Sequence, residues 1–263
     1  MNVFVIQRMM KLFDSHNHIQ DERLFPDLGN VMIRAAENGV IRMGVKGCCE
    51  NDWPRVIEIY KTYEGIYPSF GLHPWFIKDR TDQWLQTLEN LLVEYPESAV
   101  GEIGIDHAID DRDDEDQEAV FFHQLELARK LKRPVSIHCR RAWGRLIELL
   151  DQFGDLPRGM LIHCFGGSAE VAIELVKRGG YISFSGSITR PNARKAGPAI
   201  RAVPDDRILL ETDAPDILPA TAEGPHNEPA YIRLVLEKAA EFKGCSEMEL
   251  AERTFRNAEH FFG

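Results

Sequence analysis

The sequence has 263 residues, of which 44% are hydrophobic and 28% charged, with a formal net charge of −11 and a pI of about 5.3. That length suits one compact domain, and no apolar run is long enough to cross a bilayer. Because the chain is acidic, no overall basic field attracts nucleic acid, so a phosphate-bearing ligand would have to be held by a few arginines or by metal. We expect a single domain over residues 1–263, with residues 1–10 as an extension ahead of the first strand.

The five cysteines form no Cys-x-x-Cys pair, and Cys48 and Cys49 are adjacent, too close for an ordinary disulfide. Cys139 and Cys164 each follow a histidine and would point away from it on a strand, into the packing. Reduced, buried thiols explain this usage best. The first ten residues lack the basic start and long apolar region of a signal peptide, so we expect a cytoplasmic protein with no membrane attachment.

In the first half of the chain, apolar runs of strand length alternate with segments of helical spacing. They predict, in order, a strand at 11–19, a helix at 27–39, a strand at 41–47, a helix at 53–63, a strand at 66–72, a helix around 85–92 and a strand at 99–105, which Gly101 and Gly104 interrupt. The acidic residues 106–116 that follow indicate a solvated loop.

The same alternation continues in the second half of the chain. It predicts strands at 134–139, 160–165, 181–185 and 207–212. It predicts helices at 117–132, at 142–153, after Ser168, from Pro229 onward and at 247–261, with a partly helical segment at 192–203. Strands alternating with helices indicate a parallel sheet, and eight such units indicate a TIM (β/α)8 barrel with an additional C-terminal helix.

Two histidines, His16 and His18, stand two residues apart in the first strand and would therefore point to the same side. Neutral imidazole is the commonest metal ligand among side chains. Each such residue alone is more simply a packed core residue, but further candidates stand near the ends of later strands: Glu102, His138, His163 and Asp213. In this barrel class the catalytic groups gather at the carboxyl-terminal ends of the strands. Burying these groups without a shared partner would be costly, so the sequence predicts a metal site.

Six ligands exceed the roughly three protein ligands of a single catalytic zinc. They suit two divalent ions about 3.5–4 Å apart, bridged by a carboxylate and a hydroxide. We expect Glu102 to be the bridge, because its strand lies between the two histidine groups. His16, His18 and Asp213 would hold one ion, and His138 and His163 the other. Asp213 can also take a proton from the bound water, and Mg, Mn or Zn could occupy the site.

The order of these motifs resembles the TatD family of metal-dependent hydrolases, many of which are described as deoxyribonucleases. The resemblance runs from about residue 12 to residue 262 and rests on seven segments: Asp14-Ser15-His16-Asn17-His18, Gly71-Leu72-His73-Pro74, Gly101-Glu102-Ile103-Gly104-Ile105-Asp106, Ile137-His138-Cys139-Arg140, Ile162-His163-Cys164-Phe165, Glu211-Thr212-Asp213-Ala214-Pro215 and Asn227-Glu228-Pro229-Ala230. It implies a (β/α)8 barrel, a two-metal centre of the six residues above, and hydrolysis of phosphodiester bonds, often from a DNA end.

Three departures from the family pattern bear on the substrate. Arg141 occupies a position that is commonly acidic, residues 107–109 read His-Ala-Ile where relatives often have an aromatic and then a basic residue, and residues 223–226 read Glu-Gly-Pro-His where basic residues are usual. The metal ligands are complete, so these departures affect the grip on a long polyanion rather than hydrolysis itself.

The sequence also suggests supporting residues around the predicted centre. His73, at the end of the third strand, is expected to contact a substrate phosphate and to act in catalysis with Asp213. Arg140 either pairs with a surface acid or stabilises an oxyanion. Asn227 is expected to be a helix N-cap first and a substrate contact second. Arg190, Arg194 and Lys195 favour a solvated loop, although phosphate sites in such barrels often follow strands seven and eight.

The leading prediction is a two-metal nuclease that cleaves phosphodiester bonds in DNA, at an end or on a short single strand, with no obligate protein partner. An alternative keeps the metal centre and hydrolyses an amide, ester or lactone, including removal of an aminoacyl ester from RNA. A third possibility is a barrel that has lost catalysis and serves as a binding module, against which the complete ligand set argues.

Overall fold

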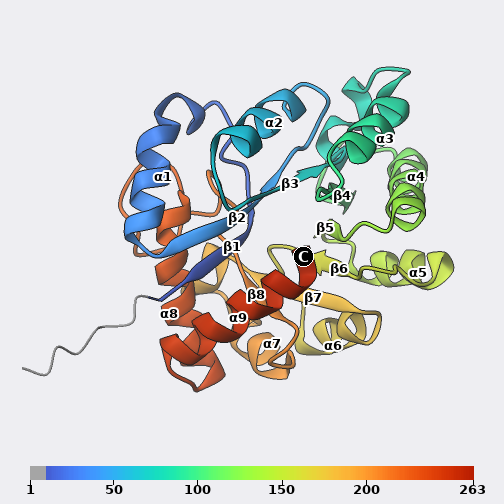
Figure 1. Ribbon diagram of the computed structural model, residues 1–263. Helices are drawn as coiled ribbons and strands as arrows, with labels where there is room; N and C mark the ends of the chain where they lie inside the picture. Colours follow the sequence, from blue (N-terminus) through green and yellow to red (C-terminus); the bar gives the residue numbers. More distant parts are fainter. Residues whose placement is uncertain (1–9) are drawn as a thin grey trace, which may run out of the picture.

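The computed structural model describes residues 10–263, so the predicted extension, except for Met10, lies outside the described part. Eight parallel strands form one sheet in the order of the sequence, with each strand bonded to the next. In Figure 1 these strands occupy the centre of the molecule and the helices surround them. The strands are β1 Leu12–Asn17, β2 Val40–Lys46, β3 Ile66–Phe70, β4 Ala99–Asp106, β5 Val135–Arg140, β6 Met160–Ile162, β7 Gly180–Phe184 and β8 Ile208–Leu210.

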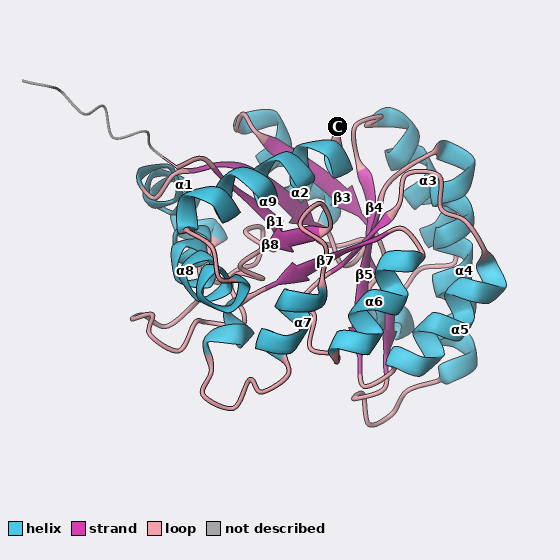
Figure 2. Ribbon diagram, turned by 90° about the horizontal axis from the view of Figure 1, so that it is seen from below, coloured by secondary structure: helices cyan, strands magenta, loops and turns pink. Residues whose placement is uncertain are grey.

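The helices cover the outside of the sheet, as Figure 2 shows from a second direction. They are α1 Leu28–Glu37, α2 Trp53–Thr62, α3 Trp84–Glu94, α4 Asp114–Leu131, α5 Trp143–Phe153, α6 Ala169–Lys177, α7 Ala196–Ala202, α8 Ile232–Lys243 and α9 Glu247–Phe262, with short 3-10 turns η1 Phe25–Asp27, η2 Pro74–Asp79, η3 Gly186–Thr189 and η4 Pro229–Tyr231. The predicted TIM (β/α)8 barrel with an additional C-terminal helix is confirmed. None of the helices within residues 10–263 combines the length and apolar character that a bilayer crossing requires.

The barrel closes where the ends of the first and last strands meet. The backbone N–H of Asp213 donates to the carbonyl of His16 at 2.9 Å. The fully buried carboxylate of Asp14 accepts from the backbone N–H of Thr212 at 2.9 Å and from its hydroxyl at 2.5 Å. Burial raises the pKa of Asp14 to about 7. This closure holds the chain just before Asp213 against the strand that carries His16.

Helix α9 covers the amino-terminal end of the barrel, and in Figure 1 it crosses in front of the strands with the C-terminus near their middle. Phe262 stacks on Phe13 of β1 with ring centroids 5.1 Å apart, and Phe261 lies 5.3 Å from Tyr181 of β7. The ammonium of Lys46 lies 4.4 Å from the ring of Phe262 and is fully buried, which lowers its pKa to about 7. The opposite, carboxyl-terminal end of the strands is left for the site.

Truncating Phe261 to alanine is expected to destabilise the fold by about 3–5 kcal/mol, because it leaves a cavity between α9 and the strand starts. Urea unfolding followed by circular dichroism measures this change in the free energy of unfolding. His260→Ala, at the exposed neighbouring position, is the control and should change stability by roughly 0.5 kcal/mol or less. Equal stability of the two variants would mean that α9 does not hold the barrel end.

Two predicted helix starts were wrong. The helix predicted to begin at residue 117 begins at Asp114, since the Asp113 side chain accepts from the backbone N–H of Asp116 at 3.0 Å and acidic residues are favourable in a first turn. The helix predicted from Pro229 begins as the 3-10 turn η4, and its N-cap is Glu228 rather than Asn227.

Four strands are shorter than predicted: β1 ends at Asn17 rather than residue 19, β3 ends at Phe70 rather than residue 72, and β6 and β8 also end early. The segment predicted as a strand at 160–165 ends at Ile162, and the one predicted at 207–212 ends at Leu210. Beyond them the backbone turns, with Cys164 at φ 43° and Asp213 at φ 59°, both in the left-handed region that ends an extended run. His163 and Asp213 therefore lie just past their strands, and the Sγ of Cys164, expected to pack away from His163 on a strand, lies 3.1 Å from Ser185 Oγ.

Candidate metal centre

The six predicted ligands meet at the carboxyl-terminal end of the barrel, around Glu102 of β4. Glycine at 104 allows β4 and β5 to approach, since a Cβ there would lie 1.9 Å from the carbonyl oxygen of His138. The prediction that glycines 101 and 104 interrupt the strand was wrong, because β4 is continuous through both. Instead, the register between β4 and β5 shifts between Val100 and Ile103. Such irregularities often re-aim a side chain next to an active site, and here the shifted residue is Glu102.

The carboxylate of Glu102 divides the histidines into two groups. Its Oε2 lies 3.2 Å from Nε2 of His16 and 3.2 Å from Nε2 of His18. Its Oε1 lies 3.0 Å from Nδ1 of His138 and 2.7 Å from Nε2 of His163. The Glu102 side chain is only 3% exposed, so its carboxylate contacts these rings rather than solvent. One buried carboxylate therefore faces two pairs of imidazoles, one with each oxygen.

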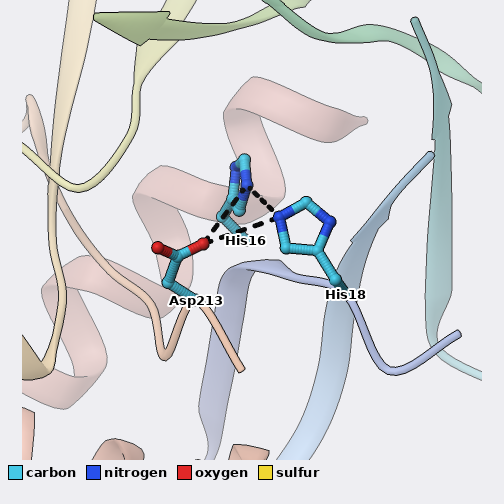
Figure 3. Close-up of side chains that lie close together, drawn as sticks. All are labelled: His16, His18 and Asp213. Atoms are coloured by element: carbon cyan, nitrogen blue, oxygen red, sulfur yellow. Dashed lines mark hydrogen bonds and ion pairs between the residues drawn. The ribbon is translucent and has the colours of Figure 1, made fainter. Parts of the chain in front are cut away.

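Asp213 completes the first group from the other side of the barrel closure. Its Oδ1 lies 3.8 Å from Nε2 of His16 and 3.5 Å from Nε2 of His18, and the two ring nitrogens are 3.1 Å apart. Figure 3 shows the two rings and the carboxylate turned toward a common point. These three side chains come from the two ends of the chain, and only the closed barrel brings them together.

The outer nitrogens of the rings determine which inner nitrogens can bind a cation. Nδ1 of His18 lies 2.8 Å from the carbonyl of Lys46, and Nε2 of His138 lies 3.2 Å from Oδ2 of Asp106. Both partners only accept, so the outer nitrogen of each neutral ring carries the proton and the inner nitrogen presents a lone pair. Nδ1 of His16 lies 3.1 Å from Ser136 Oγ, a hydroxyl that can either donate or accept.

This donor set fits divalent metal ions. Lone pairs that face one another and a carboxylate at about 3 Å repel unless a proton or a cation lies between them. Burial opposes charge on the rings of His138 and His163, yet Asp106 and then Glu102 hold the pKa of His138 above its ordinary value, and Glu102 does the same for His163. Despite the burial of Glu102, the surrounding imidazoles hold its pKa well below the usual range. Imidazole and carboxylate together suit zinc, and carboxylate also suits magnesium or manganese.

His73 also reaches Glu102 but differs from the other histidines because the nitrogen that it presents to Glu102 carries the ring proton. Its Nδ1 accepts the backbone N–H of Trp75 at 3.1 Å, so the neutral ring carries its proton on Nε2, which lies 3.3 Å from Oε1 of Glu102. Burial lowers the pKa of His73 to about 4, which keeps the ring neutral. Although His73 is near enough to Glu102 and His138 to join a metal site, the atom that it presents is a hydrogen-bond donor.

Sequence reasoning missed three groups that support or line this centre. Asp106, treated as the start of a loop, contacts His138. The fully buried Glu211 accepts from the backbone N–H of Cys164 at 2.5 Å, and its Oε1 lies 3.5 Å from Nδ1 of His163. Its position two residues before Asp213 was the available signal. The Sγ of Cys48 lies 3.9 Å from Oε2 of Glu102, and burial raises its pKa, which keeps it a thiol.

The other predicted residues lie around the centre rather than in it. Arg140 is exposed at the end of β5, and within residues 10–263 its guanidinium has no hydrogen-bond or ion-pair partner. Asn227 is fully buried, and its amide donates to the carbonyls of Thr212 at 2.7 Å and Asp216 at 2.8 Å. The exposed residues Arg190 and Arg194 line a separate pocket of about 310 Å³ between η3, α7 and α8.

A model of the TatD-related DNases matches residues 13–263 of the chain. The chain belongs to this family. Among solved structures it is similar to the TatD homologue YjjV of Escherichia coli, with a TM-score of 0.92, 32% identity and coverage of 96% of this chain and 98% of that chain. Membership confirms the resemblance of the motifs and makes the protein a metal-dependent hydrolase that acts on ester bonds.

Two curated relatives of this TatD-family chain bear on its chemistry. The first is named as an uncharacterized metal-dependent hydrolase, YabD of Bacillus subtilis, and is 36% identical over 251 residues, which cover 95% of this chain and 98% of the relative. The second is named as a 3′-5′ ssDNA/RNA exonuclease, TatD of Cronobacter sakazakii, and is 31% identical over 259 residues, covering 95% of this chain and 97% of the relative.

In this TatD-family hydrolase, Glu211→Gln is expected to weaken metal binding by about 10–100-fold, because the anionic partner of His163 becomes neutral and the ring becomes a poorer donor. Competition with a chromogenic chelator measures the affinity. Glu241→Gln, on the exposed surface of α8, is the control and should bind metal as the wild type does. Wild-type affinity in Glu211→Gln would exclude a role of this carboxylate in holding His163.

Proposed function

We propose that this protein is a two-metal phosphodiesterase that cleaves DNA, removing nucleotides from an end or from a short single strand. The observation that carries the proposal is that Oε2 of Glu102 faces His16 and His18, whereas Oε1 faces the lone-pair nitrogens of His138 and His163. In nucleases and phosphatases, two ions about 3.5–4 Å apart stabilise the attacking and leaving oxygens of the displacement. The relatives named as 3′-5′ ssDNA/RNA exonucleases, at 29–31% identity, support nucleic acid as the substrate.

In this proposal His16, His18 and Asp213 would hold one ion, His138 and His163 would hold the other, and Glu102 would be shared between them. Bound divalent ions supply polarisation of a phosphoryl oxygen and a hydroxide nucleophile at neutral pH. The residues of the chain supply the geometry, since acceptors hold the outer nitrogens of His18 and His138 and keep these two rings from turning away.

Asp213 is the proposed proton acceptor. Its side chain is 11% exposed and lies at the mouth of the barrel, whereas that of Glu102 is buried beneath the rings. A carboxylate in that position can take the proton of the attacking water at its Oδ atoms and pass it to solvent. The hydrogen bond from the backbone N–H of Asp213 to the carbonyl of His16 holds Asp213 at the barrel closure during this proton transfer.

His73 and Arg140 are proposed to contact the phosphate. The Nε2–H of His73 points into the centre and can donate to a phosphoryl oxygen as negative charge develops there. The unpaired guanidinium of Arg140, two residues after His138, suits a phosphate oxygen at the edge of the site. Asn227 is assigned a positioning role instead of a substrate contact, because its buried amide is committed to the backbone around Asp213.

The test is a nuclease assay on end-labelled single-stranded DNA, duplex DNA and RNA with Mg²⁺, Mn²⁺ or Zn²⁺. We expect stepwise shortening of DNA from one end, lost on chelation and restored by metal. An Asp213→Asn preparation made in parallel controls for contaminating nuclease. Hydrolysis of lactones or aminoacyl-RNA esters, with every oligonucleotide left intact, would contradict the proposal and favour carbonyl chemistry at the same centre.

A further inference from the structure

A second pocket, of about 300 Å³, adjoins the metal centre and is lined by Trp75, Asp106, Ala108, Ile109 and Arg140. Its volume lies at the lower end of the range for small-molecule sites, roughly 300–1,000 Å³, and so suits a single flat group rather than a duplex. Nothing in the proposed two-metal chemistry uses its most conspicuous side chain, the indole of Trp75.

Trp75 is exposed yet fixed in position. It is 54% exposed, one of the few large hydrophobic side chains so open among the described residues. Its indole Nε1–H donates to Oδ2 of Asp106 at 2.7 Å, and its backbone N–H donates to Nδ1 of His73 at 3.1 Å. A large, exposed ring that is held by one hydrogen bond from its own N–H, on a backbone held by another, loses little freedom when a flat ligand stacks on it.

The orientation of the indole places its edge toward the centre. The ring is almost perpendicular to that of His73, with an interplanar angle of 88° and centroids 5.1 Å apart, and it meets the ring of His138 at 70° and 6.4 Å. The edge that carries Nε1 contacts Asp106, and the 54% exposure of the side chain leaves ring surface open to a ligand. Ala108 and Ile109 add small apolar surface to the same pocket, and Arg140 adds a positive charge.

We propose that this pocket binds a nucleobase of the substrate, which stacks on Trp75 while the adjoining phosphate reaches Arg140 and the metal centre. The inference rests on the proposed function, because it requires a nucleic acid substrate. Stacking on an aromatic side chain tolerates every base, which suits an enzyme that must accept successive nucleotides. Trp75 is then a residue that binds substrate beside the reacting phosphate.

The first test reads binding without turnover. Of the four tryptophans, Trp53 and Trp84 are buried and Trp75 is the most exposed, so intrinsic fluorescence reports on it. Titration of the metal-loaded protein with dAMP is expected to quench the emission, whereas 2-deoxyribose 5-phosphate and inorganic phosphate should not. Trp75→Phe should lose this quench and Trp84→Phe should keep it. Equal quenching by the ligands with and without a base would overturn the inference.

The second test compares oligonucleotides with and without bases at the reacting end. Trp75→Ala should raise KM for the normal oligonucleotide by roughly tenfold, the range of base stacking on an aromatic side chain. It should leave KM for the abasic oligonucleotide nearly unchanged. Trp75→Phe, which keeps a ring but cannot donate to Asp106, should stay near the wild-type KM. Metal content and circular dichroism establish that the variants are folded.

The outcomes separate this inference from the proposed function. If oligonucleotides are cut but Trp75→Ala raises KM by the same factor for the normal and the abasic oligonucleotide, the stacking inference is wrong and the nuclease proposal stands. If Trp75→Phe is as impaired as Trp75→Ala, the indole acts through its hydrogen bond to Asp106 and the stacking inference is again wrong. If dAMP quenches Trp75 but no oligonucleotide is cut with any metal, the base site stands and the nuclease proposal fails.

Discussion

Asp213→Asn is expected to lower kcat by about 10²–10⁴-fold while the protein keeps its fold and most of its metal. Asparagine has nearly the same shape and can still offer an oxygen toward His16 and His18, but it cannot accept a proton. It also tolerates the left-handed backbone of this position, where φ is 59°. Steady-state kinetics with metal analysis of the purified variant measure the effect.

Asp216→Asn is the matched control for this prediction. Asp216 lies three residues further along the same loop, and its carboxylate pairs with Arg23 at 2.8 Å on the surface. Such pairs contribute about 0–1 kcal/mol to stability, so the control should turn over substrate as the wild type does. Turnover near the wild-type rate in Asp213→Asn, or equal losses in both variants, would remove Asp213 from its role as proton acceptor.

Glu102→Gln is expected to reduce both metal content and activity, the latter by roughly 10³-fold or more, because the group that faces both histidine pairs loses its charge. The substitution preserves volume in a site where the side chain is 3% exposed, so packing alone does not explain a loss. Elemental analysis of the dialysed protein gives metal content per chain, and circular dichroism confirms the fold.

The two variants give different patterns. Asp213→Asn should retain metal and lose turnover, whereas Glu102→Gln should lose both. Glu118→Gln is the control for removing a glutamate charge, because the carboxylate of Glu118 on α4 pairs with Arg145 of α5 at the surface. Retention of full metal content in Glu102→Gln would contradict the bridging assignment, whatever happened to activity.

The fold could be predicted from the sequence because its periodicity is local. Each strand and its helix are short apolar patterns that the chain repeats eight times, and that repetition specifies a barrel. The strand ends could not be predicted in the same way. An apolar run shows which residues can be buried, but it does not show that the backbone turns at Cys164 or Asp213, so the strands before them appeared longer than they are.

The site was predictable to the extent that its members share one pattern, a polar residue at the end of an apolar strand. The structure brings the six predicted side chains together on that basis. The groups behind them were not predictable, because Asp106 is one acid in an acidic stretch and Lys46 reaches His18 through its backbone carbonyl, which any residue possesses. Likewise, the sequence alone does not reveal that Trp75 is fixed yet exposed.

The closure of the barrel has a consequence for biosynthesis. His16 and His18 leave the ribosome early, but Asp213 and Ala214, whose backbone bonds of 2.9 and 2.7 Å join them to the first strand, follow nearly 200 residues later. A nascent chain therefore carries two early imidazoles without the carboxylate that completes their group. The group around His16 and His18 is therefore complete only when translation is almost finished, and a chain that stops before the eighth strand lacks the carboxylate of Asp213.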